Sequence, residues 1–376
     1  MEEATLTIFA MQRILQFLTV DVILLCMLAC TLVLPMDRQL VPTHMRLDAN
    51  SLGTHFYCVE AMFRATRLEI LDLTRRVLPP TFCTSSRDNV NAVEGLCIVM
   101  RRLAFPCRWL DLVPVFGRSK GSLSRIFKAT MLLLMQLHGH LLDFNPVRFT
   151  HRLSKWARKI AAKGAPAILD IVLFIDCTIR GCARPGPTPD KRVHLPPGVT
   201  LNMLQQSLFS GNKWKHGLKY QSIVSPNGLS VGCFGPREGR ENDCTTLAAS
   251  GVVPTFALMV SGGRLFRVFG DGIYPRTTQL LRPFINPPPN SPQANFNDVL
   301  AKIRVGVEWS FGLVTNTFQA VDFTRWQRCF LTNPALQYRT ATFLMNCLSC
   351  IRRTNMPAVY FQCALPTLAE YLRGYF

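Results

Sequence analysis

The stretch Ile171-Val172-Leu173-Phe174-Ile175-Asp176-Cys177-Thr178 decides the fold, because an apolar run ends in a carboxylate. Its β-branched and large apolar residues predict a largely buried strand over 167–176. Pro166 bounds this strand on one side and the loop 181–189 on the other. The sequence therefore predicts a sheet that carries an acidic residue, Asp176, at the end of a central strand.

Two further carboxylates stand in equally distinctive surroundings. Asp271 lies within Val268-Phe269-Gly270-Asp271-Gly272-Ile273-Tyr274-Pro275, and residues 264–270 predict a short strand that ends at this acid. Glu308 lies within Val305-Gly306-Val307-Glu308-Trp309-Ser310-Phe311-Gly312, in a helical pattern from 294 to 313. One buried stripe of that helix is expected to contain Leu300, Ile303, Val307 and Phe311, with Glu308 on its edge.

Three such acids suggest a metal-dependent nuclease. Two like charges about 4 Å apart repel by roughly 4 kcal/mol at an effective dielectric of ~20, so a cluster of carboxylates needs a cation. Two Mg²⁺ ions about 4 Å apart can activate the attacking hydroxyl and neutralise the leaving oxygen in phosphodiester cleavage. The alternative for each acid is ordinary: an Asp after a strand is often a turn or capping residue, and a Glu on a helix is usually solvated.

A β-hairpin is predicted between the first and second acids. Residues 218–225 and 229–234 form two strand patterns, and Ser225-Pro226-Asn227-Gly228 joins them. Pro fixes φ and Asn-Gly tolerates a positive φ, so this tetrapeptide is a strong turn signal. The order of predicted elements is strand, hairpin, strand and helix, which indicates an α/β domain.

Several motifs in order give the chain a family resemblance. Residues 93–372 resemble the DDE superfamily endonucleases of the PIF/Harbinger transposase group, including their host-domesticated derivatives. The segments that carry the resemblance are Arg101–Pro106, Phe116–Ser119, Leu123–Phe127, Ile160–Pro166, His216–Leu229, Phe234–Arg240, Gly270-Asp271 with Tyr274-Pro275, Val305–Gly312 and Asn346–Cys350.

The resemblance implies a fold, a site and a reaction. The fold is a ribonuclease H-like mixed sheet with flanking helices, which brings together a catalytic triad of Asp176, Asp271 and Glu308. The same three residues and a nearby fourth acid, Asp243, would hold Mg²⁺ or Mn²⁺ for hydrolysis of DNA. The resemblance also implies a Myb-like partner protein for DNA targeting and nuclear entry, hence a nuclear location; a cytoplasmic pool and a homo-oligomer stay open.

Two positions depart from the family pattern. Cys177 follows the first Asp where the family usually has Gly, and its larger side chain could crowd a metal or stiffen the backbone. Asn242 precedes the fourth acid where the family favours His. The second functional hypothesis is therefore a domesticated DNA-binding protein that keeps the fold without cutting.

The upstream region has a different character. Residues 1–160 are expected to form a helical domain, 161–352 the catalytic domain and 353–376 a C-terminal tail. Residues 111–130 look like a helix-turn-helix, with Gly117 as a C-cap and Ser119 as an N-cap. Lys120 and Arg125 on the second helix are candidate DNA contacts; the alternative is a simple packing unit.

The charge balance favours a polyanionic partner. The chain has 42 Lys and Arg against 23 Asp and Glu, a net charge of +19 and a pI near 9.7, as nucleic-acid-binding proteins often do. The segment Lys213-Trp214-Lys215-His216, with Lys219 beyond it, places cations around an aromatic ring. We expect these four residues, Lys213, Lys215, His216 and Lys219, to contact DNA phosphates; the alternative is a solvated loop.

Residues 14–34 are long and apolar enough to span a bilayer. Gln16 and Asp21 interrupt them, and an Asp near a membrane centre costs about 3 kcal/mol. Glu2 and Glu3 also differ from the positive start of a secretory signal. We therefore expect a helix of the N-terminal domain, with a membrane-anchored protein as the third and weakest functional hypothesis.

Pro-rich segments at 185–197 and 283–292 are expected to be loops around the active site.

Overall fold

The computed structural model describes residues 59–163, 168–186, 195, 197–329 and 331–376. The expectation for residues 14–34 therefore lies outside the described residues, as does most of the Pro-rich segment 185–197. Within the described part, no helix combines the length and the apolar character needed to cross a bilayer.

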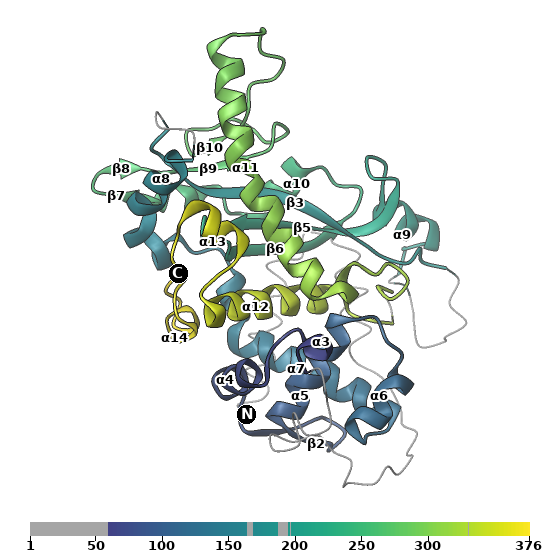
Figure 1. Cartoon of the computed structure of the whole chain (residues 1–376). Helices are drawn as coiled ribbons and strands as arrows, with labels where there is room; N and C mark the ends of the chain where they lie inside the picture. Colours follow the sequence, from purple (N-terminus) through teal and green to yellow (C-terminus); the bar gives the residue numbers. More distant parts are fainter. Residues whose placement is uncertain (1–58, 164–167, 187–194, 196, 330) are drawn as a thin grey trace, which may run out of the picture.

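A mixed sheet of six strands forms the centre of the molecule (Figure 1). Its central strand β3 is antiparallel to β5 and parallel to β9, which in turn is parallel to β10. On its other side β5 pairs with β6 and, at its first residues, with β4. Helices flank this mixed sheet, which confirms the predicted class of fold. The strands are β3 (Ile171–Gly181), β4 (Phe209–Ser210), β5 (Lys215–Val224), β6 (Ser230–Glu238), β9 (Arg267–Gly270) and β10 (Leu280–Leu281).

The central strand differs from the predicted one at both ends. The sequence predicted 167–176, whereas β3 begins at Ile171 and continues to Gly181. The continuation has a partner that local sequence does not reveal: β5 pairs with β3 from Phe174↔Val224 to Gly181↔Gly217. Asp176 consequently lies in the middle of a strand, where the burial of the apolar run gives way to partial exposure.

The predicted hairpin is confirmed. β5 and β6 are antiparallel, and the Gly228 N–H donates to the Ser225 carbonyl oxygen at 2.8 Å, with φ of Gly228 at +80°. The predicted strand 264–270 is divided: β8 (Arg264–Leu265) forms a small ladder with β7 (Val260–Ser261), and β9 alone joins the main sheet.

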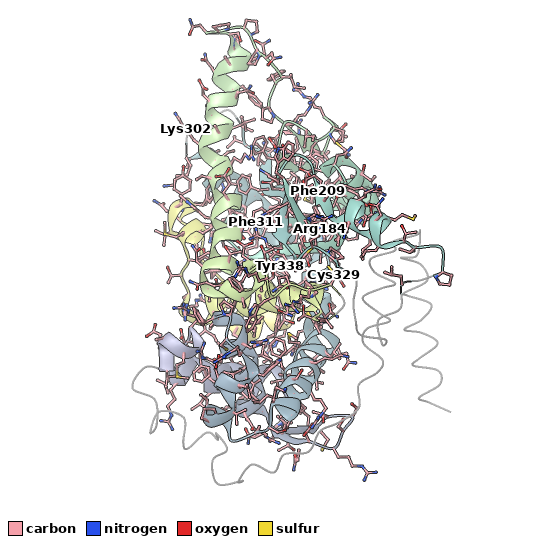
Figure 2. The ribbon with its side chains drawn as sticks, turned by 90° about the vertical axis from the view of Figure 1, so that its right-hand side faces the viewer. Arg184, Phe209, Lys302, Phe311, Cys329 and Tyr338 are labelled. Atoms are coloured by element: carbon pink, nitrogen blue, oxygen red, sulfur yellow. The ribbon has the colours of Figure 1, made fainter. Side chains whose placement is uncertain are left out.

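The predicted third-acid helix is α11 (Pro292–Thr317), two residues longer at its start and four at its end than the pattern 294–313 suggested. Ser291 caps it by accepting the Ala294 N–H at 3.1 Å. Leu300 and Ile303 are fully buried and Phe311 is partly buried, whereas the Val307 side chain lies outside the described residues. The start of α11 projects beyond the sheet, and Lys302 and Phe311 lie farther along the helix (Figures 1 and 2).

The helices before the sheet include the expected pair around Gly117. Gly117 ends α6 (Trp109–Phe116) with φ at +59°, and Ser119 caps α7 (Lys120–His138), so both predicted caps are confirmed. The second helix is longer than expected. The other elements of this part are α3 (Val59–Phe63), α4 (Arg67–Val77), β1 (Thr81–Cys83), β2 (Asn89–Asn91), α5 (Ala92–Ala104), η2 (Gly139–Leu142), η3 (Pro146–Arg152) and α8 (Leu153–Ala161).

Helix α12 (Pro334–Arg352) lies between these helices and the sheet (Figure 1). His138 at the end of α7 stacks on Phe343 of α12, with ring centroids 5.3 Å apart. On the other side, Arg339 donates to the Cys233 carbonyl oxygen of β6 at 2.6 Å. One continuous apolar core therefore joins the N-terminal helices to the sheet.

The segment expected as a tail, 353–376, packs on the same core. It forms α13 (Met356–Phe361) and α14 (Leu368–Leu372), and it ends at Phe376, whose side chain is 1% exposed. The remaining elements are α9 (Leu201–Leu208), α10 (Asp243–Ser250), η4 (Pro254–Leu258) and η5 (Gln319–Asp322).

Candidate active site

The strand register brings the first two acids together. Ile175 of β3 is the partner of Gly270 in β9, and the two strands are parallel, so Asp176 and Asp271 follow at the same level of the sheet. Gly270 has no room for a larger residue: a Cβ there would lie 2.7 Å from the Tyr274 ring and 2.9 Å from the Ile175 side chain. The missing side chain lets β9 pack closely against β3 and Tyr274, so that Asp271 follows beside Asp176.

Helix α11 delivers the third acid together with a cation. Glu308 and Arg304 are four residues apart, which places them on the same face of a helix. The three nitrogens of the Arg304 guanidinium each face a different acid. Nη1 lies 3.0 Å from Asp271 Oδ1, Nη2 lies 3.7 Å from Asp176 Oδ2, and Nε lies 4.0 Å from Glu308 Oε1.

The three carboxylates differ in their access to water. The side chain of Asp176 is 14% exposed, that of Asp271 40% and that of Glu308 60%. Burial raises the pKa of Asp176 to about 6, although Arg304 and the Cys177 N–H act in the opposite direction and Asp271 and Asp243 add to the rise. Asp176 is thus the acid that most needs a cation when it is ionised.

The donor set fits a hard divalent metal in its chemistry. Asp176, Asp271 and Glu308 offer only carboxylate oxygens, the ligands that Mg²⁺ and Mn²⁺ prefer. In the part of the chain that the structure describes, however, no three acidic, His or Cys side chains are gathered closely enough to form a metal cage. The guanidinium of Arg304 lies among the acids instead.

The expected fourth acid has another neighbour. Asp243, at the start of α10, accepts a 2.7 Å ion pair from the Lys219 Nζ, and this lysine is 5% exposed. Lys219 was expected to contact DNA, but its charge is already used by Asp243 and by the Glu241 carbonyl oxygen. The strand register explains this position. Lys219 of β5 lies opposite Ile179 of β3, and the side chain of Ile179 is on the sheet face opposite to that of Asp176.

Cys177 also points to that opposite face. Its Sγ lies 3.3 Å from the Tyr274 hydroxyl, and burial raises the pKa values of both groups. The thiol is therefore neutral and held by Tyr274. The departure from Gly at this position leaves the Asp176 side of the strand free of the larger side chain.

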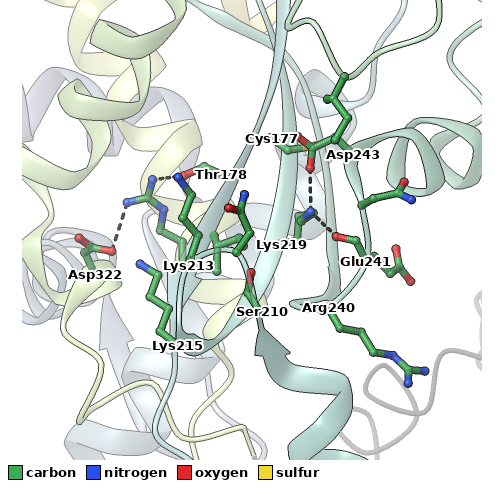
Figure 3. Close-up of a pocket in the computed structure, with 16 residues that line it drawn as sticks. Cys177, Thr178, Ser210, Lys213, Lys215, Lys219, Arg240, Glu241, Asp243 and Asp322 are labelled. Carbon is green, nitrogen blue, oxygen red and sulfur yellow. Dashed lines mark hydrogen bonds and ion pairs between the residues drawn. The ribbon is translucent and has the colours of Figure 1, made fainter.

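A basic pocket of about 520 Å³ extends from Cys177 and Ile273 to the turn between β4 and β5 (Figure 3). Cys177 follows Asp176 in the chain and Ile273 lies two residues after Asp271, but neither aspartate lines the pocket. Arg180 in its wall is paired with Asp322 at 3.2 Å. By contrast, Lys213 and Lys215 are exposed and make no ion pair with any described residue. The cations that line the pocket are Arg180, Lys213, Lys215, Lys219 and Arg240.

Aromatic rings support the turn that carries these lysines. Trp214, between them, is 84% exposed with φ at +51°. Phe209 lies edge-on to Trp214 at 6.4 Å, and it contacts the His216 ring at 5.2 Å. His216 is half-buried, and its pKa is lowered by desolvation and by Arg184. Of the four expected phosphate contacts in this segment, Lys213 and Lys215 are therefore the most accessible cations.

The candidate DNA contacts of the helical region are not equivalent. Lys120 is exposed at the first residue of α7. Arg125 donates to both oxygens of Asp88, at 2.8 and 2.9 Å, so its guanidinium is held inside the helical region. One face of α7 is buried against its neighbours, which favours the packing role for this helix pair.

Arg304 and Arg180 are site residues that the sequence interpretation missed. A signal for Arg304 was present, because an Arg four residues before a Glu on a predicted helix is a typical ion-pair spacing. The spacing does not reveal that Asp176 and Asp271 also lie close to the same guanidinium. Arg180 was overlooked because β3 was expected to end before it.

Comparison with known proteins gives one match. No curated protein and no solved structure is significantly similar to the chain. The segment 175–350, from the middle of β3 to the end of α12, matches the family model described as DDE superfamily endonuclease, and it contains Asp176, Asp271, Arg304, Glu308 and the basic pocket.

Proposed function

We propose that this protein is a metal-dependent DNA endonuclease of the transposase or transposase-derived type, in which Asp176, Asp271 and Glu308 form the metal site. One observation carries the proposal: within the family-matched segment, carboxylates from β3, from the end of β9 and from α11 converge on one guanidinium. The assignment to the PIF/Harbinger group, the nuclear location and a Myb-like partner rest on the sequence resemblance and are part of the proposal.

The chain's own residues would divide the work as follows. Asp176 and Asp271, adjacent on the sheet, would hold the metals, and Glu308 would complete the site from α11. Bound divalent metal would supply an activated water and neutralise charge on the leaving oxygen of the phosphodiester. Lys213 and Lys215 would bind backbone phosphates and orient the strand toward the aspartates.

Plasmid nicking tests this proposal. We expect Mg²⁺ or Mn²⁺ to support nicking, whereas Ca²⁺, with its looser and longer coordination, should support binding with little cutting. Asp271→Asn should lower the nicking rate by at least about a hundredfold while DNA affinity stays equal or rises, because one negative charge near the phosphates is lost. Equal nicking in EDTA would overturn the proposed mechanism.

A non-cleaving DNA-binding protein is the second candidate function. The contact of Arg304 with all three acids favours it, since a site already neutralised by the protein has less need of metal. DNA binding without nicking under every metal would select this alternative.

A further inference from the structure

Arg304 is placed differently from the other arginines of the sheet region. Its three guanidinium nitrogens are distributed over Asp271, Asp176 and Glu308 at 3.0, 3.7 and 4.0 Å. Arg267, in β9, makes an ordinary pair with a single acid, Asp170, at 3.1 Å. Arg304 thus faces a cluster of three carboxylates, whereas Arg267 pairs with one carboxylate.

The cluster stays electrically unbalanced with Arg304 in place. One positive charge faces three carboxylates, so ionised acids leave a surplus of negative charge between β3, β9 and α11. A second cation is therefore attracted to the same place. It would need the oxygens that now face the guanidinium, because Mg²⁺ and Mn²⁺ bind carboxylate oxygens at roughly 2 Å.

The guanidinium of Arg304 can move away from the three acids while its backbone stays in α11. Its side chain is 31% exposed, and the guanidinium is at the end of a long flexible stem on α11. A displaced guanidinium would remain at the rim of the site, where phosphate oxygens are complementary to its planar set of donors.

We propose that Arg304 is the resident counter-ion of the carboxylate site, that divalent metal binds by displacing it, and that Arg304 thereby sets the metal affinity. This inference rests on the metal site of the proposed function. It adds a property that the acids alone would not give: a site that is neutralised in part before any metal arrives.

Metal binding by the full-length, chelator-stripped protein without DNA tests the proposal. We expect Arg304→Gln to bind Mn²⁺ about tenfold more tightly than wild type. In this variant the guanidinium no longer forms three partly exposed ion pairs that compete with Mn²⁺ for the carboxylate oxygens. Free Mn²⁺ is measured by its electron paramagnetic resonance signal. Arg267→Gln is the matched control, because it removes the same charge from a single-partner pair, and its Mn²⁺ affinity should equal that of wild type.

Thermal unfolding and a second variant separate competition from a structural role. Arg304→Gln should melt below wild type in EDTA, and saturating Mn²⁺ should close this gap. Arg304→Lys keeps the charge, but a single ammonium cannot face three acids at once, so its Mn²⁺ affinity should lie between the other two.

Three outcomes are decisive. Affinity of Arg304→Gln and Arg304→Lys no higher than that of wild type would overturn the counter-ion role and leave the metal site intact. Absence of Mn²⁺ binding in every variant would overturn this inference and the proposed function together. Tighter Mn²⁺ binding without plasmid nicking would support the counter-ion role and reject the nuclease.

Discussion

At the scale of single residues, Asp176 combines burial with a charged neighbourhood, and this should appear in the pH dependence of stability. Its pKa rises from 3.8 to about 6 in the folded protein, chiefly by desolvation. The folded state then binds a proton more tightly than the unfolded state, so stability falls as pH rises from about 4 to 6 and stays lower above that range. The proton-linked loss is on the order of 1–3 kcal/mol.

Asp176→Asn should therefore remove this loss. In EDTA, we expect the stability of wild type to decline between pH 4 and pH 6 relative to the variant, which has no carboxyl group to titrate at this position. Denaturant unfolding at a series of pH values measures the difference. Parallel pH profiles for the two proteins would show that Asp176 is better solvated than its surroundings indicate.

At the scale of elements, the turn between β4 and β5 gives the basic pocket two exposed lysines, Lys213 and Lys215, that have no ion-pair partner among the described residues. Lys213→Ala with Lys215→Ala should weaken binding to duplex DNA whatever its sequence, because phosphate contacts carry no sequence information. Each lost contact should reduce the salt slope of log K by about 0.9, so the pair should flatten it by up to about 1.8. Binding isotherms at several salt concentrations give the slope.

Lys155→Ala with Lys302→Ala is the control for that experiment. Both lysines are exposed and neither lines the pocket, so the net charge falls equally while the pocket is unchanged. An unaltered slope in the Lys213 and Lys215 variant, or an equal change in the control, would mean that the turn is merely solvated.

At the scale of the whole molecule, the sheet and the N-terminal helices share one core, and this has a consequence for truncation. His138 stacks on Phe343, and Arg102 lies between Trp109 and Trp326, 4.1 and 3.5 Å from their ring centroids. We expect a fragment of residues 161–352 to be insoluble or to unfold without cooperativity, because it would expose this surface. Residues 59–376 should unfold cooperatively, as calorimetry of both fragments can test.

The sequence predicts those features of this structure that depend on residues close together in the chain, and it misses those that depend on distant residues. The turn at Ser225–Gly228, the caps at Gly117 and Ser119 and the helix around Glu308 depend on neighbours in the chain, and local pattern predicts them. The far end of β3 depends on pairing with β5, some forty residues away, so it was missed. The convergence on Arg304 and the pairing of Lys219 with Asp243 likewise depend on three-dimensional proximity, which single-residue chemistry cannot reveal.

The turn beside the pocket gives the protein an internal optical reporter. Of its five tryptophans, Trp214 has by far the most exposed indole, at 84%, whereas Trp156 is 1% exposed and the other three are partly buried. The intrinsic emission therefore contains one component from an indole in water, flanked by Lys213 and Lys215. An anionic quencher in solution is drawn to that indole first, so the quenchable part of the fluorescence reports on this turn while the remainder reports on the core.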